Sequence, residues 1–260
     1  MAVERVDAVE QGSPWHEEHL SRYVFASKYF KSKRVLDIAC GTGFGSEFIL
    51  NNKPDFLYAA DVSEEAIEAT KRKIEGVANS EVGFQNGCNM SFEDNSFDVV
   101  ISIETIEHIE NDIQFLAEIH RVLKPDGVLI ISTPNGLVTN PNQGKPVNQF
   151  HVREDFPKDL QRKLNTHFLI DLAAGQHVSK KFKVAPFLPS FSKHLMGSNE
   201  KVWAAIWSVI FRLPRVLRNS ISNMLLGHDF YPQVEDYTFE PENIEKAHVQ
   251  YYICRNKGIV

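Results

Sequence analysis

Short apolar runs alternate along the chain with longer segments in which apolar residues recur at helical spacing. We predict buried strands for the short runs, which lie at 34–39, 56–61, 82–85, 97–103 and 127–133. The clearest helical patterns, at 63–77 and 104–123, fall between these strands. Strands that alternate with helices are typical of βαβ units. The pattern therefore predicts an α/β fold with a mostly parallel sheet and helices on both faces.

Polar side chains lie at the ends of four of these strands: Asp37, Asp61, Asn86 and Glu104. In open parallel sheets, ligands bind where the carboxyl ends of the strands meet. We therefore expect these four residues to belong to one site.

Composition and charge bound the function. The 260 residues are 43 % hydrophobic and 24 % charged, which suits one sizeable core, and we expect a single domain over 1–260. A net charge of −6 argues against nucleic acid as the main partner. The three cysteines form no CxxC pair and no apolar stretch approaches the roughly 20 residues of a membrane span. We expect a reduced, cytoplasmic setting.

The basic residues are unevenly placed. Between 177 and 225 there are eight Lys or Arg and a single acid, Glu200. The segment is also rich in aromatic residues, and we expect a helical insertion or lid at 177–228 that shapes the acceptor site or packs on the sheet or on a second copy in a homodimer. The less favoured alternative is peripheral contact of 177–225 with an anionic membrane. A second amphipathic helix at 13–30 is expected to close over the ligand.

A glycine-rich turn follows the first predicted strand, with Gly41, Gly43 and Gly45 at alternate positions. Such glycines let the backbone turn sharply and approach a ligand closely. Asp61 lies twenty residues after Gly41, where a carboxylate can accept hydrogen bonds from ribose hydroxyls. The spacing departs from the dinucleotide fingerprint, and the Asp37 carboxylate suits a cationic amino-acid ligand better than a pyrophosphate. The turn therefore favours an adenosine-containing, positively charged ligand.

Four stretches together closely resemble the class I S-adenosylmethionine-dependent methyltransferases, in the branch that methylates oxygens of small molecules and sugars. They read VLDIACGTGFGS, AADVSEEAIEAT, NMSFEDNSFDVVISIETIEHIEN and HRVLKPDGVLIISTPN. The resemblance implies a Rossmann-like, seven-stranded sheet. Its sixth strand would be 168–174 and its last, antiparallel strand 248–256.

The resemblance also implies which residues bind S-adenosylmethionine. Asp37, Gly41 and Gly43 would line the methionine part and Asp61 the ribose, while Asn86 and Gly87 would face the adenine. Ala39, Val62 and Ile103 complete the expected cofactor contacts. Ala39 stands where many members have glycine, and Asn86 stands where many have aspartate. The amide oxygen of Asn86 can still accept from an adenine amino group.

Glu104, Glu107 and His108 would share one face of the helix predicted at 104–123. With His151 they could hold Mg²⁺ or another divalent metal. This set resembles that of the metal-dependent small-RNA ribose 2′-O-methyltransferases and the ubiquinone-pathway O-methyltransferases. Two alternatives stay open: His108 could act as a general base without metal, or the acids could merely stabilise the start of a helix. Our candidate catalytic residues are His108, Glu104 and His151.

The expected reaction is in-line transfer of a methyl group to a hydroxyl of a small molecule, with a sugar or glycan favoured, in carbohydrate or natural-product biosynthesis. An aliphatic hydroxyl has a pKa of roughly 15 and needs activation by a base or a metal. The runner-up is O-methylation of a quinone-like or lipid phenol at a membrane surface. A non-catalytic, cofactor-binding partner subunit is the third alternative.

Overall fold

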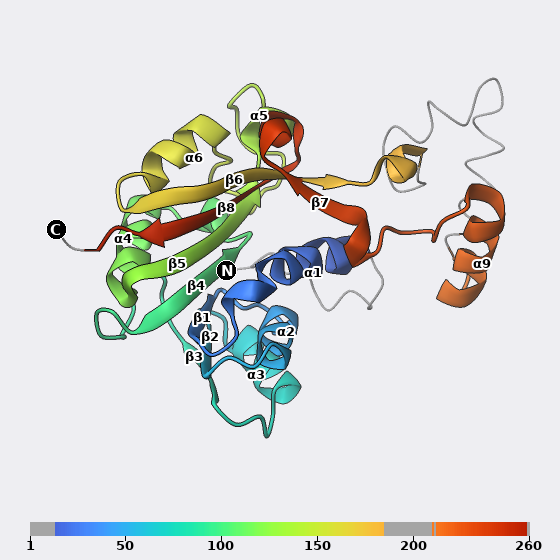
Figure 1. Cartoon of the computed structure of the whole chain (residues 1–260). Coiled ribbons are helices and arrows are strands. Elements are labelled where there is room, and N and C mark those ends of the chain that lie inside the picture. The colour runs from blue at the N-terminus through green and yellow to red at the C-terminus, as the bar shows by residue number, and fades with distance from the viewer. Residues whose placement is uncertain (1–13, 185–209, 211, 259–260) are drawn as a thin grey trace. The chain divides into compact units, whose positions relative to one another are not determined.

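A computed structural model describes residues 14–184, 210 and 212–258 and shows a sheet with the strand order β3-β2-β1-β4-β5-β8-β6-β7 (Figure 1). The strands are β1 Arg34–Ile38, β2 Phe56–Asp61, β3 Ser80–Phe84, β4 Phe97–Ile103, β5 Leu123–Pro134, β6 Phe168–Val178, β7 Tyr237–Glu240 and β8 Val249–Asn256. Strands β1 to β5 pair in parallel, and β8 lies antiparallel between β5 and β6. The predicted α/β fold with an antiparallel last strand is confirmed. With the short strand β7, the sheet of the described residues has eight strands where seven were expected.

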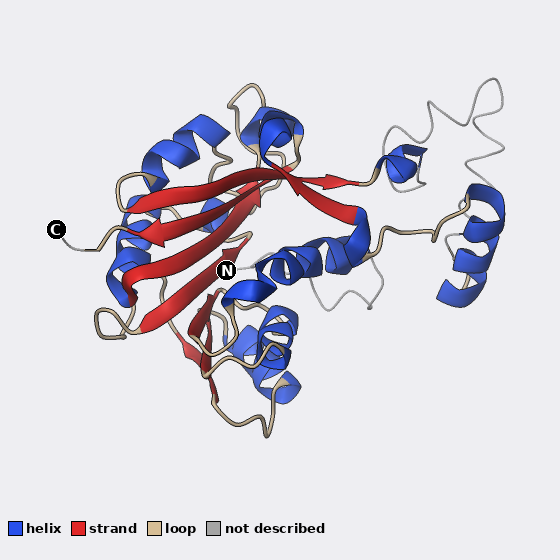
Figure 2. Ribbon diagram, in the orientation of Figure 1, coloured by secondary structure: helices blue, strands red, loops and turns tan. Residues whose placement is uncertain are grey.

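Helices connect the parallel strands except between β3 and β4, where residues 85–96 contain no helix (Figure 2). The helices are α1 Pro14–Ala26, α2 Phe44–Asn51, α3 Glu64–Lys73, α4 Asp112–Val122, α5 Gly136–Thr139, α6 Pro157–Leu164 and α9 Arg215–Leu226. Shorter 3₁₀ helices span Ser27–Tyr29, Ile106–His108, Lys180–Val184, Val234–Asp236 and Pro241–Lys246. No helix in the part of the chain that the structure describes is long and apolar enough to cross a membrane.

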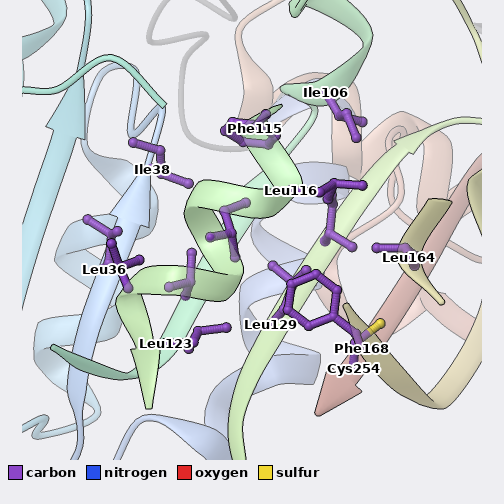
Figure 3. Close-up of a cluster of buried hydrophobic side chains, with 14 of the residues drawn as sticks. Leu36, Ile38, Ile106, Phe115, Leu116, Leu123, Leu129, Leu164, Phe168 and Cys254 are labelled. Atoms are coloured by element: carbon purple, nitrogen blue, oxygen red, sulfur yellow. The ribbon is translucent and has the colours of Figure 1, made fainter. Parts of the chain in front are cut away.

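Alternate residues of the central strands pack into two apolar clusters. Leu36 belongs to one cluster, together with Phe115 of α4 and Leu164 of α6 (Figure 3). Its neighbour Val35 belongs to the other, together with Ile49 of α2. Because successive side chains of a strand point to opposite faces, this division is what a sheet covered on both sides requires. The packing of these two clusters supports the strands at whose ends the candidate site lies.

The predicted helix over 104–123 is wrong in its first part. A 3₁₀ turn, Ile106–His108, comes first, and the backbone at Ile109 is then extended. The α-helix α4 begins only at Asp112, where the side chain of Asn111 accepts a hydrogen bond from the amide of Gln114. An asparagine cap competes with helix continuation because its side chain replaces the missing backbone acceptor. Glu104 and His108 therefore do not share a regular helical face.

The described residues form two compact units. Residues 19–177 and 239–258 make the first, which contains the core sheet. The second comprises 14–18 and the described residues between 178 and 238, including α9. Residues 185–209 and 211 of the insertion predicted at 177–228 lie outside the described residues. The lid roles of 13–30 and 177–228 stay predictions.

Candidate active site

The glycine turn after β1 is built from left-handed residues. Ala39, Gly41 and Gly43 have φ of 64°, 56° and 77°. A Cβ on Gly43 would lie within 3 Å of Thr70, so this glycine allows α3 to pack closely. A Cβ on Gly41 would meet nothing within 4 Å, although Thr70 Oγ1 donates to the Gly41 carbonyl at 3.0 Å. The turn is therefore fixed on its α3 side and open at Gly41, where a ligand could approach the backbone.

Asp61 at the end of β2 is tied to this turn. Its Oδ2 accepts from the Gly41 amide at 3.0 Å and its Oδ1 from the Ser63 amide at 2.9 Å. Each carboxylate oxygen keeps a further lone pair for a ligand hydroxyl. The next residue, Val62, is 55 % exposed, which is unusual for valine at the end of a buried strand. The pair offers one polar and one apolar contact to a nucleoside.

Asp37 is fully buried beside the turn. Its carboxylate accepts from Ser46 Oγ at 2.6 Å and from Tyr23 Oη at 3.2 Å. Burial raises the pKa of Asp37 to about 6, although both hydrogen bonds act in the opposite direction. Asp37 is therefore a buried acid that titrates close to neutral pH.

The residues expected near the adenine lie on the adjoining loops. Asn86 is exposed, and its side-chain oxygen accepts from the Cys88 amide at 2.9 Å. Gly87 is buried because the ring of Phe115 covers it, and a Cβ there would lie 2.5 Å from that ring. Ile103 at the end of β4 is also buried. Their contacts with cofactor stay predictions.

Glu104 has a role separate from its neighbours. Its backbone is left-handed, with φ of 50°, and its Oε1 accepts from Ser132 Oγ at 2.8 Å. The same oxygen lies 3.6 Å from Nη1 of Arg22, whose side chain is 1 % exposed. Arg22 Nε also donates to Gln176 at 2.7 Å. The Glu104 carboxylate is thus held by a buried guanidinium.

The other three candidate metal ligands converge. Glu107, His108 and His151 each offer one ligand atom, and these atoms lie within 4.8 Å of one another. Glu104 is not part of this group. Glu107 is buried and accepts from Thr133 Oγ1 at 2.8 Å. Burial, and secondarily the nearby Glu104 carboxylate, raise the pKa of Glu107 well above its ordinary value.

The Nδ1 atom of each imidazole forms a hydrogen bond with an oxygen atom of the loop that follows β5. His108 Nδ1 lies 3.0 Å from the Phe150 carbonyl, which can only accept. His151 Nδ1 lies 2.6 Å from Glu154 Oε1, and its Nε2 lies 3.0 Å from the Asn148 amide nitrogen. Both rings therefore carry the proton on Nδ1 and a lone pair on Nε2. One carboxylate and two such imidazoles are a suitable donor set for a divalent metal.

Sequence reasoning missed several residues of the site. Thr133 contacts Glu107, Glu154 contacts His151, and Ser46 contacts Asp37. None of these three contacting residues was a candidate. Glu154 follows His151 by three residues, a spacing that could have drawn attention to it. The contacts of Thr133 and Ser46 form only in the folded sheet, so no local sequence pattern indicates them.

Comparisons with known proteins place part of the chain in a family and identify similar proteins. The family described as "Methyltransferase domain" matches residues 36–131. A probable S-adenosylmethionine-dependent methyltransferase of Mycolicibacterium smegmatis is 31 % identical over 152 residues, 58 % of each chain. The mitochondrial ubiquinone biosynthesis O-methyltransferase of Schizosaccharomyces pombe is 29 % identical over 63 % of this chain and 54 % of its own.

A solved structure supports the fold. The crystal structure of an S-adenosylmethionine-dependent methyltransferase from Aquifex aeolicus is 20 % identical, covers 63 % of this chain and 87 % of its own, and has a TM-score of 0.53. The chain spans a little more than half the length of the curated relatives named above. Residues 36–131 match the methyltransferase domain family, and the sheet order and the glycine turn agree with a domain of the class I S-adenosylmethionine-dependent type.

Proposed function

We propose that this protein transfers the methyl group of S-adenosylmethionine to an oxygen of a small molecule. The observation that carries the proposal is the convergence of Glu107, His108 and His151. The first two follow β4, the strand that pairs directly with β1, which leads into the glycine turn. Nucleophile activation and methyl donor would thus meet at one edge of the sheet.

The residues of the turn fit the cofactor. The open side of Gly41 accommodates a ligand, Asp61 has lone pairs for ribose hydroxyls, and buried Asp37 offers negative charge to a cation. The cofactor supplies an electrophilic methyl group on a sulfonium. The task of the protein is to hold the acceptor oxygen in line with it and to exclude water.

The Glu107, His108 and His151 group also fits a divalent metal. When bound, such an ion would supply positive charge that lowers the pKa of an acceptor hydroxyl. Glu107 would hold the ion through its carboxylate and both histidines through Nε2. Without an ion, His108 Nε2 has the lone pair required of a general base. Both routes serve an oxygen nucleophile.

A sugar or glycan hydroxyl is the acceptor that we favour. A divalent ion held by Glu107, His108 and His151 would also attract two neighbouring oxygens of a sugar diol. The expected place of such a reaction is carbohydrate or natural-product biosynthesis. The neighbouring oxygens of a quinone-like phenol would satisfy the same geometry, and the similar Schizosaccharomyces pombe protein is named for ubiquinone biosynthesis.

Helix α9 favours this second acceptor. Val216, Leu217 and Met224 are exposed and recur at helical spacing on one face. Arg212 and Arg215 beside them are exposed as well. Exposed apolar residues flanked by arginines suit the surface of an anionic membrane, where a lipid phenol would be found.

The test supplies methyl-labelled S-adenosylmethionine and an extract of the source organism to the purified protein. Label is then measured in lipid, polymer and soluble small-molecule fractions. Label in glycan or soluble small molecules supports the sugar acceptor, and label in lipid supports the phenol. The variants Glu107→Gln and His108→Asn should lose at least about tenfold in rate.

The control variant is Glu75→Gln, which makes the same chemical change at an exposed position and should keep full activity. Unchanged turnover in Glu107→Gln and His108→Asn together would refute the assignment of the site. Binding of S-adenosylmethionine with no labelled product in any fraction would favour the non-catalytic partner subunit.

A further inference from the structure

We propose that Glu154 is a positioning residue, which fixes the orientation and tautomer of His151 so that Nε2 can bind a divalent cation. This inference rests on the metal-dependent form of the proposed function. Glu154 is not one of the predicted metal ligands. Its carboxylate contacts Nδ1 of His151, whereas Nε2 of the same ring would bind the cation.

The contacts of Glu154 are those of an orienting carboxylate. Its side chain is 5 % exposed and that of His151 is 9 % exposed. Oε1 lies 2.6 Å from His151 Nδ1, and Oε2 accepts from Thr139 Oγ1 at 2.5 Å. A carboxylate only accepts, so it retains the proton on Nδ1 and leaves the lone pair on Nε2. Metal-binding histidines almost always have such a partner on their second nitrogen.

The backbone around Glu154 packs against the start of α5, just after β5. A Cβ added to Gly136 would lie 2.2 Å from the Glu154 carbonyl oxygen, so the two backbones pack in direct contact. The Gly136 amide also donates to the Asp155 carbonyl at 3.1 Å. Helix α5, which carries Thr139, begins at Gly136. The Glu154 backbone and carboxylate are therefore both held by residues of α5.

The opposite side of the loop is tied to the segment that carries the other two ligands. The Val152 amide donates to the Glu107 carbonyl at 2.8 Å. Lys163 Nζ lies 2.6 Å from carboxylate oxygens of both Asp112 and Asp155, and so links the start of α4 to the loop. Glu154 and His151 are thus placed between two anchored segments.

The arrangement favours orientation for a ligand over a merely structural ion pair. A purely structural ion pair would need only the contact between His151 Nδ1 and Glu154. The His151 ring also contacts the His108 ring, with centroids 4.9 Å apart and planes at 80°. His151 Nε2 accepts from the side-chain Nδ2 of Asn148, and a bound ion would take the place of that hydrogen bond. Asn148 Oδ1 still holds the loop by accepting from the Phe150 amide.

The experiment measures Mn²⁺ affinity of the full chain by calorimetry and by electron paramagnetic resonance. Glu154→Gln keeps the size of the side chain but weakens its hold on Nδ1–H. We expect its Mn²⁺ affinity to fall about tenfold or more, the range typical of such partners, with S-adenosylmethionine affinity unchanged. Glu75→Gln, the matched exposed control, should bind Mn²⁺ as the wild type does.

Thr139→Val serves as a second variant if Glu154→Gln does not fold. It leaves Glu154 in place but removes its second partner, and we expect a smaller loss of Mn²⁺ affinity, of a few-fold. Wild-type affinity in every folded variant would overturn the proposal, as would a wild-type protein that binds no Mn²⁺.

These outcomes are separate from those of the methylation assay. A protein that methylates without binding Mn²⁺ would retain the proposed function through His108 and lose this inference. A protein in which Glu154→Gln weakens Mn²⁺ binding, but which yields no labelled product, would keep the inference and lose the proposed function.

Discussion

S-adenosylmethionine should bind more weakly as the pH falls through 6, because the cationic ligand needs Asp37 in its ionised form. Burial raises the folded-state pKa of Asp37 to about 6. Below that pH the carboxyl group is protonated and its charge is lost. Asp37 is ionised in about nine tenths of the molecules at pH 7 and in about one tenth at pH 5. The apparent affinity for S-adenosylmethionine should therefore fall about tenfold. This corresponds to about 1.4 kcal/mol of binding free energy.

Calorimetric titration at pH 5, 6 and 7, in buffers of different ionisation enthalpy, measures both the affinity and the protons released on binding. Proton release should be greatest between pH 5 and 6. Ser46→Ala removes the closer of the two donors to Asp37, so the transition should move to higher pH. Asp37→Asn should abolish the transition. An affinity that is constant from pH 5 to 7 in a folded protein would refute the reasoning.

Three further predictions concern stability. Gly136→Ala would place its Cβ 2.2 Å from the Glu154 carbonyl oxygen and should cost about 1–3 kcal/mol in urea unfolding, whereas Gly144→Ala, which meets nothing within 4 Å, should cost less than about 0.5 kcal/mol. Arg22→Met would leave Glu104 without its buried partner and should cost about 3 kcal/mol, so a loss below about 1 kcal/mol would contradict the ion pair. Mn²⁺ at a hundred times its Kd should add about 2.7 kcal/mol to the free energy of unfolding, seen as a rise in Tm, and no rise would count against the metal site.

Local rules were enough for the elements whose signals are carried by neighbouring residues. Ser63 caps α3 by accepting from the Ala66 amide, as its place before two glutamates indicates. The strands at 56–61 and 97–103 begin and end as predicted, because buried parallel strands are continuous apolar runs. The gathering of polar strand ends at one edge follows from the parallel order alone.

Local rules failed where distant contacts decide. The spacing of apolar residues over 104–123 is helical, but the loop at 148–155 takes the backbone hydrogen bonds of Glu107 and holds the first part as a separate turn. From the sequence, Arg22 is one of the polar residues of an amphipathic helix. Its partner Glu104 lies 82 positions later, and nothing near Arg22 in the sequence indicates that pairing. Ion pairs of this kind are visible only once the sheet brings the segments together.

The position of β8 has a consequence for folding during synthesis. Strand β8 is synthesised after the seven other strands of this sheet, yet it lies between β5 and β6 and separates them. Strand β6 therefore cannot pair with β5, and β6 and β7 cannot join the sheet until residues 249–256 have been made. Asn256 then donates from its side chain to the carbonyls of His120, Leu123 and Lys124. Strands β1 to β5 can pair as the chain emerges, so the nascent protein would carry an exposed edge along β5 until β8 covers it.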